Sequence, residues 1–460
     1  MPTSKEDKAE DTPEADYDVI IVGSGIAGLY SGVELLRRSS GATSRKKLRV
    51  AIVEKEGRLG GRAHTFKGKV EGRPVQWEAG AGRISSEHRL VRGLLRRYKL
   101  TWLPIGASVE FKGTVASPLE PNAFEPAIPI MLDTLAGLPA ADLSRSTIRQ
   151  LLTRIHGPVA ADNYLVRFPY RAEVDIMRAD MALSAFGGEM RAHEGYGICK
   201  EGLSALIDAM GADFQRRGGV IMQGRTLHDV THDRVTEQAV CIFKGGDSGS
   251  GEPLRAQHVV LAIPSAAAAE LPALRGWSTL RHLRMTPLLR IYGVFPKGGP
   301  AGPDKLWYED GGRIVTAGRV RYMIPGSAAM GSAQISYTDS QDAELWMEKL
   351  KREGQEAVGR QIVHELREWI DPRIPTPLFV KAHPWEHGAT YWLPGQYDPV
   401  AESRAAVQPL PAALPSVWAC GESYSLRQAW MEGAVEHAEL MLEGLLKKLS
   451  ASTKRQRHAR

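Results

Sequence analysis

Three glycines near the N-terminus have the spacing of a phosphate-binding turn. Gly23, Gly25 and Gly28 form the pattern GxGxxG directly after the apolar run "DVIIV", with Ile26 and Ala27 between the last two glycines. The first glycine permits a tight turn, the second lets the backbone approach a pyrophosphate, and the third lets a helix pack on a strand. The spacing alone is weak evidence, because a chance turn can have it.

An acidic residue and a second glycine pair follow. Glu54 ends the next apolar run, "LRVAIVEKE", where its carboxylate can accept both hydroxyls of an adenosine ribose and would repel a 2′-phosphate. Lys55 comes next, and "GRLGGR" then places Gly61 and Arg62 where a guanidinium can lie beside a diphosphate. The strand, turn, helix and Glu54 together predict a dinucleotide other than NADP. For the second glycine pair, a plain turn is the alternative.

A third glycine-rich stretch ends in an arginine. In "WEAGAGRISSEH", Gly80, Ala81 and Gly82 precede Arg83, whose guanidinium cannot lose its charge. One interpretation is a solvated surface arginine. The other is an anion clamp, because a guanidinium offers a carboxylate two parallel hydrogen bonds.

The elements that must position these residues begin with a βαβ unit. The apolar runs 18–22 and 48–54 predict two buried parallel strands, joined by an amphipathic helix. From 85 to about 191 the pattern is mainly helical, with a proline-rich crossing near 118–129. The later elements that we expect are a helix and strand at 201–221, strands at 256–264, 287–296 and 333–340, one long helix at 342–370, and a closing strand, loop and helix at 416–446.

The composition is that of a soluble globular protein with two or three domains. The chain has 460 residues and 43% hydrophobic content, and its three cysteines are too few and too scattered for a disulfide framework or a metal cluster. We therefore expect a reducing, cytoplasmic location and no metal. The leader lacks an apolar signal region, and no apolar run could span a membrane. The basic tail "KKLSASTKRQRHAR" predicts a solvated end, so we expect no nucleic-acid partner, and binding to nucleic acid or to an anionic membrane surface is the alternative.

The order of GxGxxG, Glu54 and "GGR" resembles the flavin amine oxidase superfamily, which includes monoamine, polyamine and L-amino-acid oxidases. The resemblance covers nearly the whole chain after the leader and implies an α/β fold: a doubly wound, Rossmann-like FAD-binding domain with an inserted α+β substrate domain. The expected division is a leader at 1–16, FAD-binding stretches at 17–84, 196–264 and 408–448, substrate-binding stretches with the helical insertion at 85–195 and 265–407, and a basic tail at 449–460.

Three further blocks support the resemblance and imply more cofactor contacts. "YGICKEGLSALIDAM" is similar to a family segment that leads to the strand beside adenine, "AHPWEHGATYWLPGQY" to one with a tryptophan near the flavin, and "WACGESYSLRQAWMEGAVEHA" to the closing block. The last block implies a helix whose positive N-terminal end faces the flavin ring. The contacts implied by these blocks are Leu227, Trp385, Gly421, Glu422, Met431 and Ala434.

The resemblance also implies aromatic walls beside the flavin. Trp430 stands where the family has one wall, although a tryptophan under a helix is commonly part of the core. Tyr391 and Trp392 are both candidates for the other wall, because this segment is a residue shorter than in the relatives.

Two positions depart from the family pattern. Gly388, Ala389 and Thr390 occupy the segment where monoamine oxidases have a cysteine bonded to the flavin, so we expect non-covalent FAD. Arg290 occupies the region of the family's lysine that is linked to the flavin through water, with Lys297 further on. The second departure leaves open whether the enzyme is an oxidase or a dehydrogenase.

"GAGRI" resembles the stretch of L-amino-acid oxidases whose arginine binds the substrate's α-carboxylate, whereas monoamine oxidases lack that residue. We therefore favour Arg83 as a carboxylate clamp and expect FAD-dependent oxidation of an L-amino acid to an imino acid, then a keto acid and ammonia, with oxygen reduced to hydrogen peroxide. The alternatives are an amine or polyamine oxidase in which Arg83 serves the cofactor, and a flavin-binding protein with little turnover. The sequence specifies neither the substrate's side chain nor the oligomeric state, and it allows a homodimer.

Overall fold

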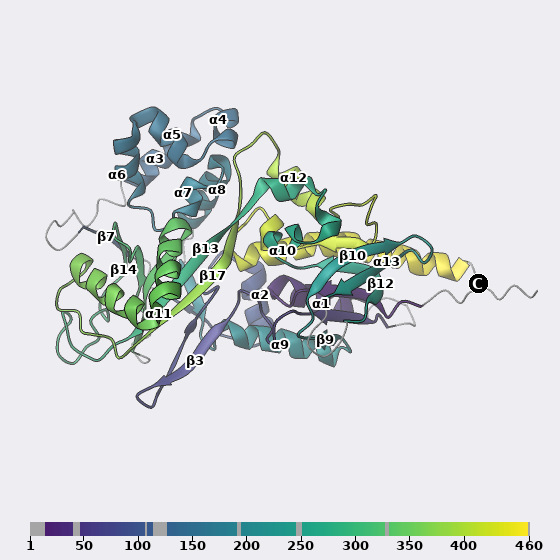
Figure 1. The fold of residues 1–460 in the computed structure, drawn as a ribbon, viewed down its shortest axis with the longest axis horizontal. Coiled ribbons are helices and arrows are strands. Elements are labelled where there is room, and N and C mark those ends of the chain that lie inside the picture. The colour runs from purple at the N-terminus through teal and green to yellow at the C-terminus, as the bar shows by residue number, and fades with distance from the viewer. Residues whose placement is uncertain are drawn as a thin grey trace, which may run out of the picture.

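The computed structural model describes residues 14–39, 47–105, 108–113, 127–190, 195–244, 251–326 and 331–458. Most of the expected leader, part of the proline-rich crossing and the last two residues of the basic tail lie outside these residues. Figure 1 shows two large sheets side by side, with a group of short helices beyond the ends of the long strands β13 and β17. Within the described residues, no helix is both long and apolar enough to cross a membrane.

The first sheet carries the βαβ unit predicted from the sequence. Its strands are β1 (Tyr17–Val22), β2 (Val50–Val53), β9 (Val220–Met222), β10 (Leu227–Asp233), β11 (Gln238–Phe243), β12 (Leu254–Leu261) and β18 (Val417–Ala419). The order is β10-β11-β12-β1-β2-β9, and β18 pairs in parallel with the end of β12. Strands β9, β2, β1 and β12 are parallel to one another, as expected for apolar strands covered on both faces.

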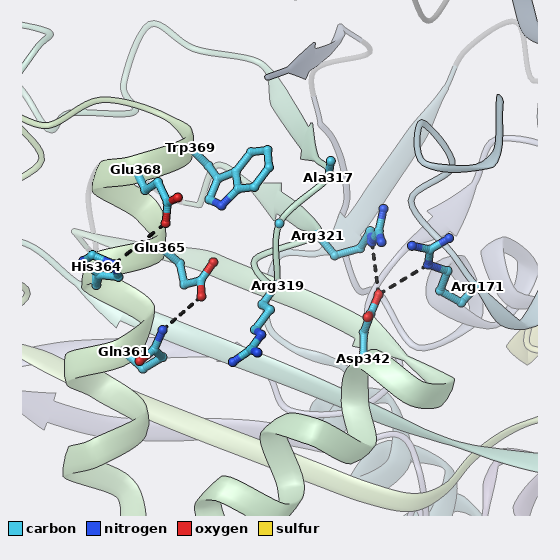
Figure 2. Close-up of a pocket in the computed structure, with 11 residues that line it drawn as sticks. Arg171, Ala317, Arg319, Arg321, Asp342, Gln361, His364, Glu365, Glu368 and Trp369 are labelled. Carbon is cyan, nitrogen blue, oxygen red and sulfur yellow. Dashed lines mark hydrogen bonds and ion pairs between the residues drawn. The ribbon is translucent and has the colours of Figure 1, made fainter. Parts of the chain in front are cut away.

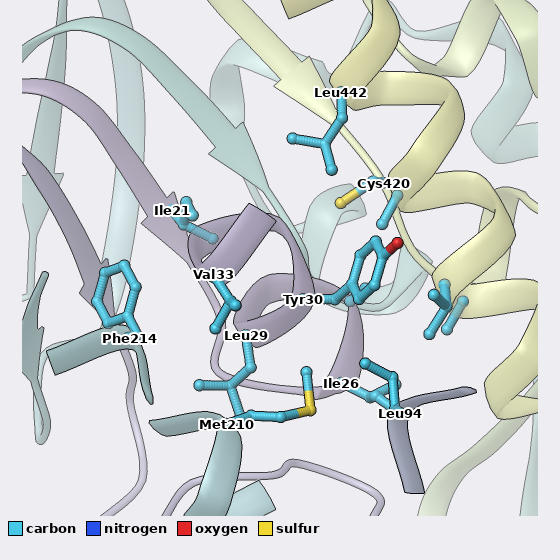
Figure 3. Packing of buried hydrophobic residues seen from close by; sticks show 14 of the residues in the cluster. Ile21, Ile26, Leu29, Tyr30, Val33, Leu94, Met210, Phe214, Cys420 and Leu442 are labelled. Carbon is cyan, nitrogen blue, oxygen red and sulfur yellow. The ribbon is translucent and has the colours of Figure 1, made fainter. Parts of the chain in front are cut away.

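Helices cover one face of this sheet and form the largest core cluster. They are α1 (Ile26–Ser39), α9 (Leu203–Arg216) and α13 (Met431–His458). Figure 3 shows Ile21 of β1, Leu29 and Val33 of α1, Phe214 of α9 and Leu442 of α13 packed together. On the other face, Ile20, Val22 and Val53 pack against a cluster that includes residues of β10 and β11 and of α10 (Ser265–Ala269). This α/β architecture confirms the predicted fold class.

The second large sheet has the order β17-β13-β16-β15-β14-β7. Its strands are β7 (Val109–Lys112), β13 (Leu283–Val294), β14 (Arg313–Thr316), β15 (Tyr322–Ile324), β16 (Ser332–Asp339) and β17 (Phe379–Trp392). Smaller sheets are formed by β3 (Thr65–Val70) with β4 (Arg73–Glu78), and by β5 (Ile84–Ser85), β8 (Tyr196–Cys199) and β6 (Trp102–Pro104). Strands β6 and β7 fall in the stretch predicted to be mainly helical.

The helices of that stretch are short. They are α2 (Arg89–Arg97), α3 (Ala127–Ala136), α4 (Ala140–Arg145), α5 (Ile148–His156), α6 (Pro158–Leu165), α7 (Ala172–Asp175) and α8 (Ala179–Met190). Helix α5 begins with a capping box in which Thr147 and Gln150 satisfy each other's backbone N–H groups. Other helical segments are α12 (Pro399–Ala406) and the 3₁₀ turns Pro272–Leu274, Ser278–His282 and Glu422–Tyr424.

Helix α11 (Ser340–Trp369) corrects the prediction of one continuous helix at 342–370. Its backbone breaks at Gly354, which has φ 81° and ψ 175°, a conformation that glycine adopts without the cost of a Cβ. The two halves therefore run in different directions. We propose that the domain boundaries are those expected from the sequence. The first sheet takes its strands from separate parts of the chain, within 17–261 and at 417–419, as a discontinuous FAD-binding domain requires.

Candidate active site

The predicted phosphate-binding turn joins β1 to α1. A Cβ built on Gly28 would lie 2.0 Å from the carbonyl oxygen of Gly23, so only glycine lets the helix pack this closely on the turn. A Cβ on Gly25 would meet nothing within 4 Å. Ile26 and Ala27 form the first helical turn and are buried. The turn is thus closely packed between Gly23 and Gly28, and it leaves open space beside Gly25.

Glu54 follows β2 and is buried against the same turn. Its Oε2 accepts hydrogen bonds from the backbone N–H and the hydroxyl of Ser24, at 2.8 and 2.6 Å. The segment between β9 and Leu227 crosses this end of the sheet, since the N–H of Arg225 donates to the carbonyl of Glu54 at 3.0 Å. Lys55 instead points to solvent, where its ammonium lies 3.5 Å from Glu56.

Arg62 connects the second glycine pair to the closing block. Its guanidinium lies 2.8 Å from the Glu422 carboxylate and donates to the carbonyl of Gly388 at 3.0 Å. Glu422 is buried and also accepts from the N–H groups of Thr390 and Ala429, at 3.0 and 2.8 Å. Motifs from three distant parts of the sequence therefore meet at one ion pair.

The third glycine-rich stretch runs beside Arg62. The N–H of Ala81 donates to the Arg62 carbonyl at 2.8 Å, and a Cβ on Gly80 would lie 2.0 Å from the same oxygen. The indole N–H of Trp385 donates to the carbonyl of Ala79 at 2.7 Å, so this predicted flavin neighbour lies against the same stretch.

These residues fit a flavin dinucleotide. Gly421 has φ 135°, and a Cβ there, as at Gly25, would meet no atom within 4 Å. Gly61 lies next to Gly25, with only the Cα of Gly25 at 3.6 Å from its position for a Cβ. Open glycine backbone beside a buried carboxylate and a partly buried ion pair is the surface that a diphosphate and a ribose need.

Arg83 lies among aromatic rings. Among the described residues, its guanidinium carbon lies 5.5 Å from the ring of Tyr170, 5.2 Å from Tyr196, 5.8 Å from Tyr322 and 5.6 Å from Trp430. Its Nη2 donates to the hydroxyl of Tyr170. We call these four rings the Arg83 cage. Arg83 is half-buried, which excludes the interpretation as a fully solvated surface arginine.

Three of the four cage residues, Tyr170, Tyr196 and Tyr322, were not predicted from the sequence. Tyr170 precedes α7, Tyr322 begins β15, and Tyr196 begins β8, so three distant segments supply them. Tyr196 stood in the quoted block "YGICKEG", but no spacing pointed to it or to the other two tyrosines. Their roles follow from the tertiary contacts alone.

Trp430 forms one side of the cage directly before α13. Its ring stacks on Tyr196 at 5.8 Å and 8°, and His88 meets its edge at 4.9 Å. Burial, with the charges of Arg427 and Arg83, lowers the pKa of His88 to about 3, so this imidazole is neutral at physiological pH. Met431 and Ala434 follow in the first turn of α13 and are buried.

The two candidates for the other wall differ in environment. Trp392 is fully buried in the cluster around the first sheet, and its indole N–H donates to the Ser425 carbonyl at 3.0 Å. Tyr391 packs instead against the short helices. Because successive side chains of a strand point to opposite faces, β17 separates the two. The environment of Trp392 is that of a core residue, and the wall role of Tyr391 stays a prediction.

Arg290 is buried beneath the third glycine-rich stretch. Its Nη1 would lie 2.7 Å from a Cβ on Gly82, and it donates to the carbonyl of Glu78 at 3.3 Å. Burial raises the pKa of the Glu78 carboxyl to about 7, so that group only partly offsets the positive charges of Arg290 and Arg83 near neutral pH.

Glu432 is a further residue whose role was not predicted from the sequence. It is buried in the first turn of α13, and its carboxylate accepts from the N–H groups of Leu90 and Val91 at 2.8 Å each. These are first-turn donors of α2, so Glu432 caps that helix and ties it to the segment that carries Trp430.

Solved structures share this fold. They include a variant of putrescine oxidase with redesigned cofactor binding (17% identity, TM-score 0.70), wild-type putrescine oxidase bound to putrescine (15%, 0.70) and cyclohexylamine oxidase from Brevibacterium oxydans IH-35A (18%, 0.67). Each comparison covers 94% of this chain and 99% of the other. At these identities the likeness shows the fold alone.

No curated protein sequence matches the chain. The model of the flavin-containing amine oxidoreductase family matches residues 26–440, which include Gly28 of the glycine turn, Glu54, Arg62, Arg83 and the closing block. This match spans most of the chain and confirms the resemblance inferred from the motifs. The protein belongs to the flavin-containing amine oxidoreductases, and its cofactor is FAD.

Proposed function

We propose that this flavin amine oxidase acts on L-amino acids, with Arg83 binding the substrate's carboxylate. The observation that carries the proposal is the position of Arg83, which extends the glycine-rich stretch beside Arg62 and Trp385 and lies within the Arg83 cage. Two parallel hydrogen bonds from the guanidinium would fix the carboxylate and thereby orient the Cα–H bond.

The cage would also act on the amine. Aromatic rings exclude water, and desolvation lowers the pKa of an ammonium group, which favours the neutral amine that can lose a hydride from Cα. Hydride acceptance and the reduction of oxygen to hydrogen peroxide are the chemistry that bound FAD supplies. The released imino acid hydrolyses in water to a keto acid and ammonia.

An amine oxidase without a carboxylate clamp is the second candidate. Aromatic faces attract ammonium groups as well as guanidinium groups, so the cage would also suit a cationic amine. The solved putrescine and cyclohexylamine oxidases act on substrates without a carboxylate, as their names state.

The test of the function is turnover by FAD-loaded protein with pairs of L-amino acids and the amines that remain after decarboxylation, and with polyamines. Peroxide release and an artificial electron acceptor are measured in parallel, since an enzyme slow with oxygen reduces only the acceptor. We expect the amino acid of each pair to react. Turnover confined to amines would support the second candidate, and no turnover with either readout would support a flavin-binding protein.

FAD is held without a covalent bond, and we expect acid precipitation to release it into the supernatant. The segment Gly388, Ala389 and Thr390 offers no thiol, and Cys199, Cys241 and Cys420 are all buried. The measurement is the absorbance spectrum of the supernatant and of the redissolved pellet. A yellow pellet would contradict non-covalent binding of FAD.

Replacing Glu54 with glutamine is expected to weaken FAD binding and leave turnover at saturating FAD unchanged. Glutamine keeps the shape of the side chain but loses the charge-assisted contacts, worth about 1.5 to 3 kcal/mol, so the dissociation constant should rise about 10- to 100-fold. Glu56→Gln is the matched control, because Glu56 is exposed and pairs only weakly with Lys55. Low turnover of Glu54→Gln at full FAD occupancy would show that Glu54 has a role besides FAD binding.

A further inference from the structure

A second polar site lies between α11 and the turn at 317–321, which joins β14 to β15. It is a cavity of about 440 Å³. Figure 2 shows carboxylates of the second half of α11 on one side and guanidiniums on the other. The break at Gly354 lets both halves of the helix line it, since Asp342 belongs to the first half. Its charged lining consists of Arg171, Arg319, Arg321, Asp342, Glu365 and Glu368.

The positive side has one guanidinium more than the carboxylates beside it, because the buried Asp339 acts on Arg321 in addition to Asp342 and neither pairs with Arg319. The Nε atoms of Arg171 and Arg321 lie 3.5 and 3.2 Å from the same oxygen of Asp342. Burial and the charge of Arg171 lower the pKa of Arg321, although Asp342 acts in the opposite direction. Arg319 is exposed and has no ion pair among the described residues.

The negative side lies on the second half of α11. Glu365 is buried and accepts a hydrogen bond from Gln361 at 3.0 Å. Glu368 lies one turn further along, 3.8 Å from the imidazole of His364. Three guanidiniums and the Asp342 carboxylate thus lie on one side of the cavity, and the Glu365 and Glu368 carboxylates lie on the other.

We propose that this cavity binds a small zwitterion, with its carboxylate at Arg319 and Arg171 and its ammonium at Glu365 and Glu368. The guanidinium fork matches a carboxylate, and an ammonium can donate to both glutamates. A ligand without net charge but with separated charges satisfies both sides. A ligand with a single charge would be attracted at one side only and would leave the other side unpaired.

The site is coupled to the Arg83 cage through the backbone. Arg171 follows Tyr170, and Arg321 precedes Tyr322, so the same two segments carry a guanidinium into the cavity and a ring to Arg83. The rings of Tyr170 and Tyr322 also pack edge to face at 5.9 Å. A carboxylate that draws Arg171 away from Asp342 would shift these rings, and hence the position of Arg83.

Calorimetric titration of FAD-loaded protein with 4-aminobutyrate, in the absence of oxygen, tests the site. Butyrate and butylamine are matched probes that each carry one of its two charges. We expect 4-aminobutyrate to bind at least about tenfold more tightly than either. No binding, or equal binding of a singly charged probe, would overturn the zwitterion site.

Variants locate the binding. Arg319→Ala and Glu368→Gln should each weaken 4-aminobutyrate binding about tenfold or more, whereas Arg360→Ala removes a charge from the same helix outside the cavity and should have no effect. Arg83→Ala should also leave this binding unchanged. Loss of binding in Arg83→Ala would place the probe at the flavin site instead and overturn the proposal, whatever the enzyme's substrate proves to be.

The coupling rests on the proposed function and has its own measurement. Saturating 4-aminobutyrate should change the KM for the amino-acid substrate in the wild type and not in Arg319→Ala. An unchanged KM in the wild type, with binding established by calorimetry, would refute the coupling and leave the binding site in place.

Discussion

Arg83→Ala is expected to lower kcat/KM for an L-amino acid by a hundredfold or more. A carboxylate left unpaired in a water-poor site costs about 3 to 5 kcal/mol. Lysine should restore only part of the rate, because a point charge cannot reproduce two parallel hydrogen bonds. Tyr170→Phe removes the hydroxyl that accepts from Arg83 and should cost about tenfold.

The decisive comparison is between the amino acid and its decarboxylated amine. The amine has no carboxylate for Arg83 to bind, so any reaction with it should be unaffected by the substitution. Arg89→Ala, an exposed arginine at the start of α2, is the matched control. Flavin occupancy is followed by absorbance. A loss that is equal for both substrates, or that follows the flavin content, would show that Arg83 serves the cofactor and would favour the amine oxidase candidate.

Alanine substitutions at Gly25 and Gly28 should both weaken FAD binding, but only Gly28→Ala should destabilise the fold. A Cβ at Gly28 would lie 2.0 Å from the carbonyl oxygen of Gly23, so Gly28→Ala must push α1 off the turn. Overpacking of this kind costs about 3 kcal/mol or more when backbone has to move. We expect the Gly28→Ala protein to unfold at a lower temperature than the wild type and to retain little FAD.

Gly25→Ala should fold normally and still lose FAD. The added Cβ meets no protein atom within 4 Å, so the stability of the protein without cofactor should change by less than about 0.5 kcal/mol. The methyl group would instead occupy the space open to a diphosphate. The measurements are thermal unfolding of flavin-free protein and the FAD dissociation constant. Unchanged FAD binding in Gly25→Ala would place the diphosphate elsewhere.

The sequence offers more local signals for the cofactor site than for the substrate site, for a physical reason. Gly25, Glu54 and Arg62 lie in or near one βαβ unit, whose local geometry determines how a diphosphate can bind. Tyr170 and Tyr322 reach Arg83 only because the short helices and the second sheet pack together, and such contacts leave no periodic signal along the chain.

Two other differences could have been anticipated from local rules. The alternation of side chains along a strand implies that Tyr391 and Trp392 cannot both face the substrate. Gly354 in the middle of a predicted 29-residue helix, 342–370, is a position where a break costs little. By contrast, the cap that Glu432 provides for α2 depends on two helices far apart in the sequence, and no local pattern indicates it.

The ion pair between Arg62 and Glu422 has a consequence for biosynthesis. A ribosome adds roughly 5 to 20 residues per second, so the partner of Arg62 is made on the order of tens of seconds after it. Until then β12 lacks β18, and α1 lacks the cover of α13. The nascent chain therefore carries the α13-facing side of α1 uncovered through most of its translation, and the Arg62–Glu422 ion pair can form only after Glu422 has been added.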